Sequence, residues 1–266
     1  INQYGPSLLV CFNSFCSFMS GTQLVAVNDA FIYVHGYEWG PGVSKVIVSL
    51  SRSVEKVLKD NATIITGTKE RKITNIYLSD AKGDHVEGNS TYVTLELDIV
   101  FDSKVSPFNF NITTFQNKWA STYVVKSTFY VTAEGKDVTI TIDKDLINNR
   151  ICPDTEKFTN RGSFSGKYTN PMTNQIETLT LQYAAYEPKE LKDDNAKNPL
   201  IIWIHGQGEG GTDVDIALLG NEVTSLARPK IQSYFTTEKG SKGSYVLVVQ
   251  CPTYWMDGGD GKNSLG

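Results

Sequence analysis

The run HGQGEGG at residues 205–211 directly follows the apolar segment Pro199–Ile204. Glycine has no Cβ, so a backbone rich in glycine can turn sharply and present its N–H groups to open space. Fixed N–H donors stabilise the negative charge that develops on a carbonyl oxygen when a nucleophile attacks it. These residue types at this spacing therefore indicate acyl-transfer chemistry, with the donors among Gly206, Gln207 and Gly208.

A glycine loop after a central strand supplies part of the oxyanion hole in α/β-hydrolases. We predict that the backbone N–H of Gln207 is the donor and that Gly206 or Gly208 lies beside it. His205 is not the catalytic base, because in these enzymes the base follows the nucleophile along the chain. Four residues are expected to support the loop: His205, Glu209, Gly210 and Gly211. For Glu209, a solvated carboxylate is an equal alternative.

Two other interpretations of the run stay open. The first is a plain glycine-rich turn. The second is the dinucleotide fingerprint, because Gly206, Gly208 and Gly211 formally fit G-x-G-x-x-G. That fingerprint calls for an acidic residue about 20 residues further on, at the end of the next strand. The next apolar run, Tyr245–Gln250, lies further away and continues into Cys251-Pro252, which disfavours a nucleotide site.

Tyr254 and Trp255 follow the apolar run Tyr245–Gln250. The carboxyl ends of parallel strands are where α/β sheets bind ligands, so both aromatic residues are candidates for a substrate pocket. Packing beneath a loop is an equal alternative. The four cysteines form no C-x-x-C pair and no histidine lies at ligand spacing, so neither a metal nor a cofactor is predicted.

Two domains are expected from the periodicity of apolar residues. Residues 25–146 are predicted to form an all-β immunoglobulin-like sandwich, because short alternating segments are separated by turn residues. One of these predicted turns is Lys59-Asp60-Asn61. The predicted strands of the sandwich include Val43–Leu50, Lys72–Leu78, Thr91–Phe101, Tyr123–Thr132 and Val138–Ile142.

After a linker at residues 147–159, the pattern changes to α/β. Residues 160–266 are predicted to be the N-terminal part of an α/β-hydrolase domain, with a mostly parallel sheet that starts with an antiparallel hairpin, Phe164–Tyr168 and Ile176–Tyr186. Pro199–Ile204 is apolar throughout, as expected of a strand covered on both faces. A helix should follow, with Thr212 as its N-cap and Pro229 as its end. Its apolar face would comprise Ile216, Leu219, Val223 and Leu226.

Composition excludes several classes of protein. Hydrophobic residues make up 40% and charged residues 20% of the 266, and the net charge is −4. Nucleic-acid binding is not expected, because no basic cluster is present. No apolar run approaches the ~18 residues of a membrane span. Residues 1–24 are predicted to be a leader or a disordered segment. The apolar stretch Ser7–Met19 within them fits the tail of a secretory signal, which favours a secreted or cell-envelope protein.

Three segments carry a resemblance to a known family. HGQGEGG at residues 205–211, CPTYWMDGG at residues 251–259 and TFQNKWASTYVV at residues 114–125 are similar to bacterial esterases with an N-terminal immunoglobulin-like domain. These proteins are also described as predicted peptidases of the prolyl-oligopeptidase-like group. The resemblance implies hydrolysis of carboxylesters, either small esters or feruloyl and acetyl esters linked to polysaccharide.

The chain contains no Gly-x-Ser-x-Gly nucleophile elbow. We therefore expect it to be the front part of a serine hydrolase, without the catalytic triad and inactive by itself. The alternatives are an immunoglobulin-like carbohydrate-binding or adhesion module, and a serine peptidase of the same fold. The oligomeric state is left open.

Overall fold

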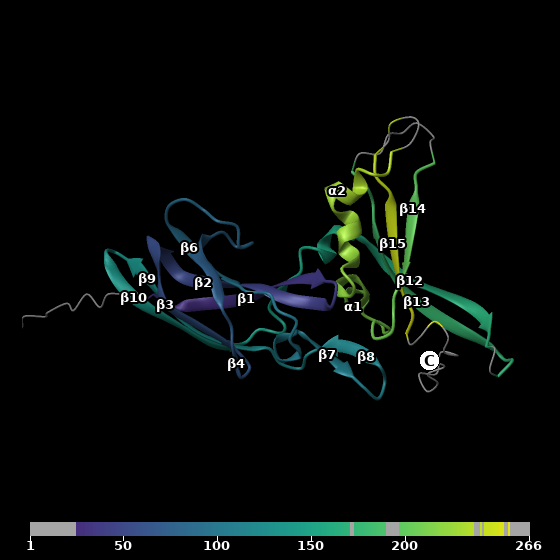
Figure 1. Ribbon diagram of the computed structural model, residues 1–266, viewed down its shortest axis with the longest axis horizontal. Helices are drawn as coiled ribbons and strands as arrows, with labels where there is room; N and C mark the ends of the chain where they lie inside the picture. Colours follow the sequence, from purple (N-terminus) through teal and green to yellow (C-terminus); the bar gives the residue numbers. More distant parts are fainter. Residues whose placement is uncertain are drawn as a thin grey trace, which may run out of the picture.

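The computed structural model describes residues 25–170, 173–189, 197–236, 240, 242–252 and 255. In Figure 1 a β-sandwich, coloured purple to teal, is followed by a smaller sheet with helices against one of its faces. The hypothesis of a leader at residues 1–24 falls outside the described residues. No helix in the described ranges combines the length and apolar character that crossing a membrane requires.

Two sheets form the sandwich. One has the order β11-β1-β2-β6-β5 and the other the order β10-β9-β3-β4. The strands of the five-stranded sheet are β1 (Val27–Tyr37), β2 (Gly40–Val54), β5 (Ile73–Ser79), β6 (Ser90–Leu97) and β11 (Arg150–Ile151). Those of the four-stranded sheet of the sandwich are β3 (Lys56–Thr66), β4 (Lys69–Glu70), β9 (Val124–Ala133) and β10 (Lys136–Asp145). Alternate residues of β1, including Ala30, Ile32 and Val34, are fully buried, so one face of each strand forms the core between the sheets.

The all-β architecture of residues 25–146 agrees with the prediction, and two details differ. Lys59–Asn61 does not reverse the chain but lies within β3, where the pairing with β9 shifts register between Leu58 and Thr63. Asn61 has φ 63°, so the extra residues are absorbed as a bulge and the strand continues. The strand predicted at Thr91–Phe101 ends at Leu97.

A separate hairpin projects from the sandwich toward the second part of the chain. It consists of β7 (Phe108–Asn111) and β8 (Gln116–Trp119), which pair only with each other among the described strands. Figure 1 shows this hairpin below α1. Between β6 and β7 lies the 3₁₀ helix η1 (Ser103–Val105).

Outside the sandwich lies a four-stranded sheet with the order β12-β13-β15-β14, which is called the second sheet from here on. Its strands are β12 (Asn160–Thr169), β13 (Ile176–Tyr186), β14 (Leu200–Ile204) and β15 (Tyr245–Gln250). β12 and β13 form the predicted antiparallel hairpin, β13 pairs antiparallel with β15, and β14 pairs parallel with β15. Parallel pairing requires a crossover, which the helices between β14 and β15 provide.

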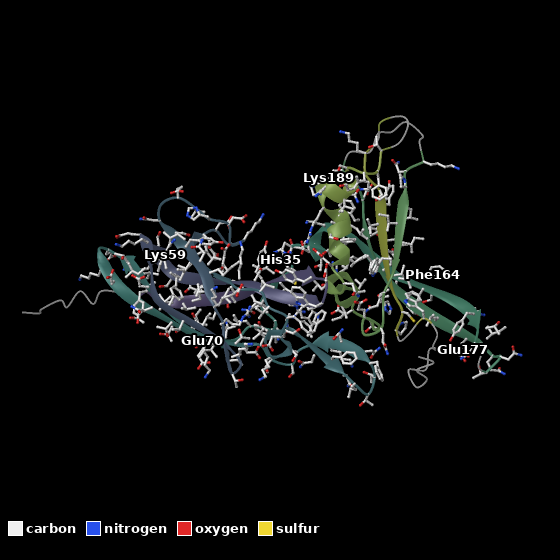
Figure 2. All side chains as sticks on the ribbon, in the orientation of Figure 1. His35, Lys59, Glu70, Phe164, Glu177 and Lys189 are labelled. Carbon is white, nitrogen blue, oxygen red and sulfur yellow. The ribbon has the colours of Figure 1, made fainter. Side chains whose placement is uncertain are left out.

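The expectation that β14 is covered on both faces is wrong. Leu200, Ile202 and Ile204 are 55%, 56% and 59% exposed, whereas Ile201 and Trp203 pack against the core. The reason is that helices cover only one face of the sheet within the described residues. The same open face carries Phe164 of β12, whose side chain points outward in Figure 2.

The single predicted helix is broken into three pieces: α1 (Val214–Leu219), the 3₁₀ helix η3 (Val223–Ala227) and α2 (Pro229–Gln232). The N-cap of α1 is Asp213 and not Thr212, because the Asp213 carboxylate accepts the N–H of Asp215. After Gly220, two residues with left-handed backbone, Asn221 and Glu222, redirect the chain. Pro229 begins α2 where it was expected to end the helix, which suits its fixed φ at a first helical position.

Helix α1 lies between two apolar cores. Its Ile216 and Leu219 belong to the core of the sandwich, whereas Ala217 and Leu218 pack in the core of the second sheet. All four side chains are at most 4% exposed. Because α1 buries apolar side chains in both cores, it joins the two parts of the molecule.

The segment predicted as a linker also contacts the sandwich. β11 pairs parallel with β1, and the 3₁₀ helix η2 (Thr155–Lys157) follows it. His35 Nδ1 lies 2.7 Å from the Asp154 carboxylate, at the end of the sandwich that faces the helices (Figure 2). Burial opposes ionisation of Asp154, but the hydrogen bond with His35 holds the pKa of this carboxyl below its ordinary value.

Candidate functional site

The glycine loop, residues 205–211, connects the carboxyl end of β14 to the start of α1. β15 lies beside β14, so the residues after β15 come close to the loop. The β7–β8 hairpin approaches from the sandwich, with an isolated bridge between Gln116 and Gly208. Two distant segments of the chain, the residues after β15 and the β7–β8 hairpin, therefore approach the loop.

His205 anchors the first turn of the loop. Its ring is buried, Nε2 accepts the backbone N–H of Cys251 at 3.1 Å, and Nδ1 lies 2.8 Å from the carbonyl oxygen of Gly206. A backbone N–H can only donate, so Nε2 is the acceptor and Nδ1 carries the proton that it donates to Gly206. Burial lowers the pKa of His205, which favours this neutral form. Both ring nitrogens have backbone partners, which leaves none for proton transfer to a substrate.

The peptide between His205 and Gly206 is held from both sides. The indole N–H of Trp255 donates to the carbonyl of His205 at 2.8 Å. The N–H of Gly206 donates to the Glu209 carboxylate at 3.0 Å. Because its N–H is already occupied by Glu209, Gly206 is not available as an oxyanion donor in this conformation.

Glu209 is a buried carboxylate inside the loop. Burial raises its pKa, while the hydrogen bonds from Gly206 and from the Asn221 side-chain amide favour the ionised form. Gly220 makes room for it, because a Cβ at position 220 would lie 2.0 Å from the Glu209 carboxylate oxygen. The turn after α1 and the glycine loop are thus shaped around one carboxylate.

Gly208 and Gly211 are the two glycines of the loop with a positive φ, and Gly208 also approaches the sandwich closely. Its φ is +99°, and an added Cβ would lie 3.1 Å from the side-chain nitrogen of Asn117. Its carbonyl oxygen accepts the backbone N–H of Asn117 at 2.6 Å. Gly206 differs, because a Cβ there would meet no heavy atom closer than 4.0 Å and no positive φ is required.

The end of β15 holds the second half of the loop. The side-chain amide of Gln250, which is fully buried, donates to the carbonyl of Glu209 at 2.9 Å. The N–H of Gly211 donates to the carbonyl of Cys251 at 2.8 Å. Gly210, between these two contacts, is buried.

Gln207 is the exposed residue at the tip of the loop. In the described part of the chain, no acceptor takes its backbone N–H. In a trans peptide the N–H points away from the preceding carbonyl, and the carbonyl of Gly206 is fixed by His205. The direction of the Gln207 N–H is therefore set by the His205 ring. A cavity of about 250 Å³ adjoins it, lined in part by Gln207, Glu209, Trp39 and Asn117.

Hydrogen bonds involve five of the predicted loop residues and Trp255 around Gln207: His205, Gly206, Gly208, Glu209 and Gly211. Trp255 is 38% exposed and is bonded to the loop, and Tyr254 lies outside the described residues. Sequence reasoning missed Asn117, Asn221 and Gln250. A polar residue that ends an otherwise apolar strand, as Gln250 does in YVLVVQ, was a usable signal. Asn117 lies in segment 114–125, which carries the family resemblance without singling this residue out, and nothing in the local sequence marks Asn221.

Two findings place the sandwich among known domains. Two facing sheets of antiparallel strands, with the core between them, define an immunoglobulin-like sandwich. Residues 31–139 match the family model described as the esterase Ig-like N-terminal domain.

Among solved structures, the chain is similar to one described as "Crystal Structure of a Thermostable Esterase", with a TM-score of 0.60. The two chains are 20% identical, so this similarity concerns the fold. The match covers 85% of this chain and 58% of the length of that esterase. No curated protein matches. The resemblance indicated by the motifs agrees with the family model, which matches the esterase Ig-like N-terminal domain, and the solved esterase shares the fold over 85% of this chain.

Proposed function

We propose that the protein is a serine carboxylester hydrolase that acts through an acyl-enzyme, and that the backbone N–H of Gln207 is one donor of its oxyanion hole. The observation that carries the proposal is the orientation of this N–H. It has no acceptor in the described chain, its peptide plane is fixed by His205, and Gln207 is one of the residues that line a cavity. A donor held rigid before the reaction stabilises developing charge without reorganisation.

The arrangement of the second sheet supports an α/β-hydrolase. An antiparallel hairpin precedes a parallel pair joined by a helical crossover, and the loop lies at the carboxyl end of β14. That is the end of the strands where α/β folds place their reactive groups. The second oxyanion donor would be the N–H that follows the nucleophilic serine.

The chemistry assigned to residues 205–211 is limited to the oxyanion. When a serine attacks the ester carbonyl, the oxygen gains charge and the Gln207 N–H donates to it. The serine, its histidine base and the orienting acid are proposed to lie outside residues 1–266, because these contain no Gly-x-Ser-x-Gly. His205 would position the donor and Glu209 would hold the turn. Neither would move a proton to or from the substrate.

The proposed substrate is a small ester or an ester linked to polysaccharide. The residues that line the 250 Å³ cavity include the polar Asn117 and Asn221 and the aromatic Trp39. Aromatic walls with a few polar groups suit an acyl or sugar portion of moderate size. No role for a metal, cofactor, nucleic acid or membrane is proposed.

Active-site labelling tests this function. The full-length protein encoded by the gene should hydrolyse p-nitrophenyl acetate and react with a fluorophosphonate at one serine outside residues 1–266. The 266-residue chain should do neither. Labelling of a serine within residues 1–266, with loss of turnover, would contradict the proposal. Faster hydrolysis of a peptide p-nitroanilide than of the ester would favour a serine peptidase of the same fold.

A second candidate, carbohydrate binding by the sandwich, rests on a different cavity. A hollow of about 200 Å³ is lined by Trp39, Phe101 and Phe110, which are 45%, 75% and 50% exposed. Trp39 is stacked on Tyr37 with ring centroids 5.2 Å apart and an interplanar angle of 7°. Exposed aromatic clusters mark binding surfaces. Retention of the full-length protein on insoluble polysaccharide, with no hydrolysis of either substrate, would favour this candidate.

A further inference from the structure

We infer that the β7–β8 hairpin of the immunoglobulin-like domain positions the catalytic loop, with the backbone N–H of Asn117 as the group that fixes Gly208. This inference rests on the proposed function for its catalytic consequence. Its structural content is independent of that function. Asn117 is thus a positioning residue, because Asn117 would affect the reaction only through the loop.

The contact is a backbone pairing between two parts of the chain that are far apart in sequence. The Asn117 N–H donates to the Gly208 carbonyl at 2.6 Å, and Gln116 and Gly208 form a parallel bridge. Asn117 opposes Phe110 across the hairpin, and Phe110 is also a near neighbour of Gly208. Gly208 thus pairs with the edge of the hairpin, so that one backbone N–H of β8 and one carbonyl of the loop are both hydrogen-bonded.

Two side chains of β8 add contacts on either side of the loop. The amide of Gln116 donates to the carbonyl of Pro252 at 2.8 Å, just beyond the end of β15. The indole N–H of Trp119 donates to Asp213, the N-cap of α1, at 2.9 Å. The Trp119 ring is itself held between Phe108, with centroids 4.7 Å apart, and the Arg150 guanidinium at 4.0 Å. The hairpin therefore contacts the middle of the loop, the helix after it and the segment after β15.

Gly208 needs this support because glycine is the least restricted residue. At φ +99° it is the pivot between the peptide that carries the Gln207 carbonyl and the peptide that Asn117 holds. His205 fixes the plane on one side of Gln207 and Asn117 fixes the plane beyond Gly208. If the hydrogen bond from His205 or the one from Asn117 is lost, the loop backbone can rotate, and the Gln207 N–H would sample directions away from the oxyanion.

The test compares Asn117→Pro with Asn117→Ala. Proline removes the N–H that reaches Gly208, whereas alanine keeps it and removes only the side chain. In the 266-residue chain, amide hydrogen exchange of residues 206–211 should be about three- to tenfold faster in Asn117→Pro than in Asn117→Ala, as expected for the loss of one hydrogen bond. In the full-length protein, kcat for p-nitrophenyl acetate should fall by a similar factor with KM within about twofold, because only the transition state carries the oxyanion.

A second variant, Gln116→Met, keeps the inference testable if proline disrupts the hairpin, and Lys118→Ala, at the exposed residue of β8, is its control. Gln116→Met should raise exchange in residues 206–211 and lower kcat, and Lys118→Ala should change neither. Unchanged exchange in both Asn117→Pro and Gln116→Met would overturn the inference. If the full-length protein turns over no ester, the proposed function fails, and the exchange comparison still decides whether the hairpin positions the loop.

Discussion

Under the proposed function, the imidazole of His205 would orient the oxyanion donor without taking part in the chemistry. Its neutral form accepts the Cys251 N–H and donates to the Gly206 carbonyl, so the ring connects β15 to the loop. Protonation of Nε2 would place an N–H against the Cys251 N–H. The expected support by His205 and Glu209 therefore has a physical form in the structure, while its effect on catalysis stays a prediction.

The depressed pKa of His205 predicts a pH dependence of stability. A histidine whose folded pKa lies below its unfolded value stabilises the fold above the unfolded value, near 6.5, and this stability is lost as the pH falls through the folded pKa. Between pH 7.5 and 5.5, the free energy of unfolding of the 266-residue chain should decrease, and His205→Gln should reduce that decrease. Urea denaturation of both proteins across this range measures the difference. Equal pH slopes would mean that His205 is not held neutral.

At the scale of elements, the strands were predictable and the connections were not. The β12–β13 hairpin and the strand–loop–helix order follow from apolar periodicity and turn residues, which are local signals. The break after α1 depends on Gly220, whose missing Cβ accommodates the Glu209 carboxylate. The contact of Asn117 with Gly208 depends on the approach of two domains. Features fixed by tertiary contacts leave no periodic trace in the sequence, so the roles of Asn117 and Asn221 could not be predicted.

Substitutions of Leu219 in α1 and of Ile202 in β14, two side chains of similar size, should differ in their effect on the free energy of unfolding. Leu219→Ala should destabilise the 266-residue chain by about 2–5 kcal/mol, because the side chain is fully buried in the sandwich core beside Gly36. Ile202→Thr on the open face of β14 should change stability by about 0.5 kcal/mol or less, because Ile202 is 56% exposed. Chemical denaturation gives both values. A small loss for Leu219→Ala would show that α1 does not join the two cores.

At the scale of the whole molecule, the immunoglobulin-like domain and the second sheet share one helix and one loop. α1 contributes to both cores, and the β7–β8 hairpin contacts the loop and the segment after β15. A domain that matches the esterase Ig-like N-terminal family is therefore in direct contact with the proposed oxyanion site. The sandwich would then influence catalysis through positioning as well as through any binding of substrate.

The central claim is that the loop provides a preorganised oxyanion donor, and Gly208→Val against Gln207→Ala tests it most directly. In the full-length protein, valine at a residue with φ +99° should force the loop to re-form with its donor misdirected. kcat for p-nitrophenyl acetate should then fall by about 10²–10³-fold, with a smaller change in KM. Gln207→Ala keeps the backbone N–H and should cost far less. If the Gly208→Val protein melts at the parental temperature and keeps a near-parental kcat, the loop is only a turn and the site assignment is wrong.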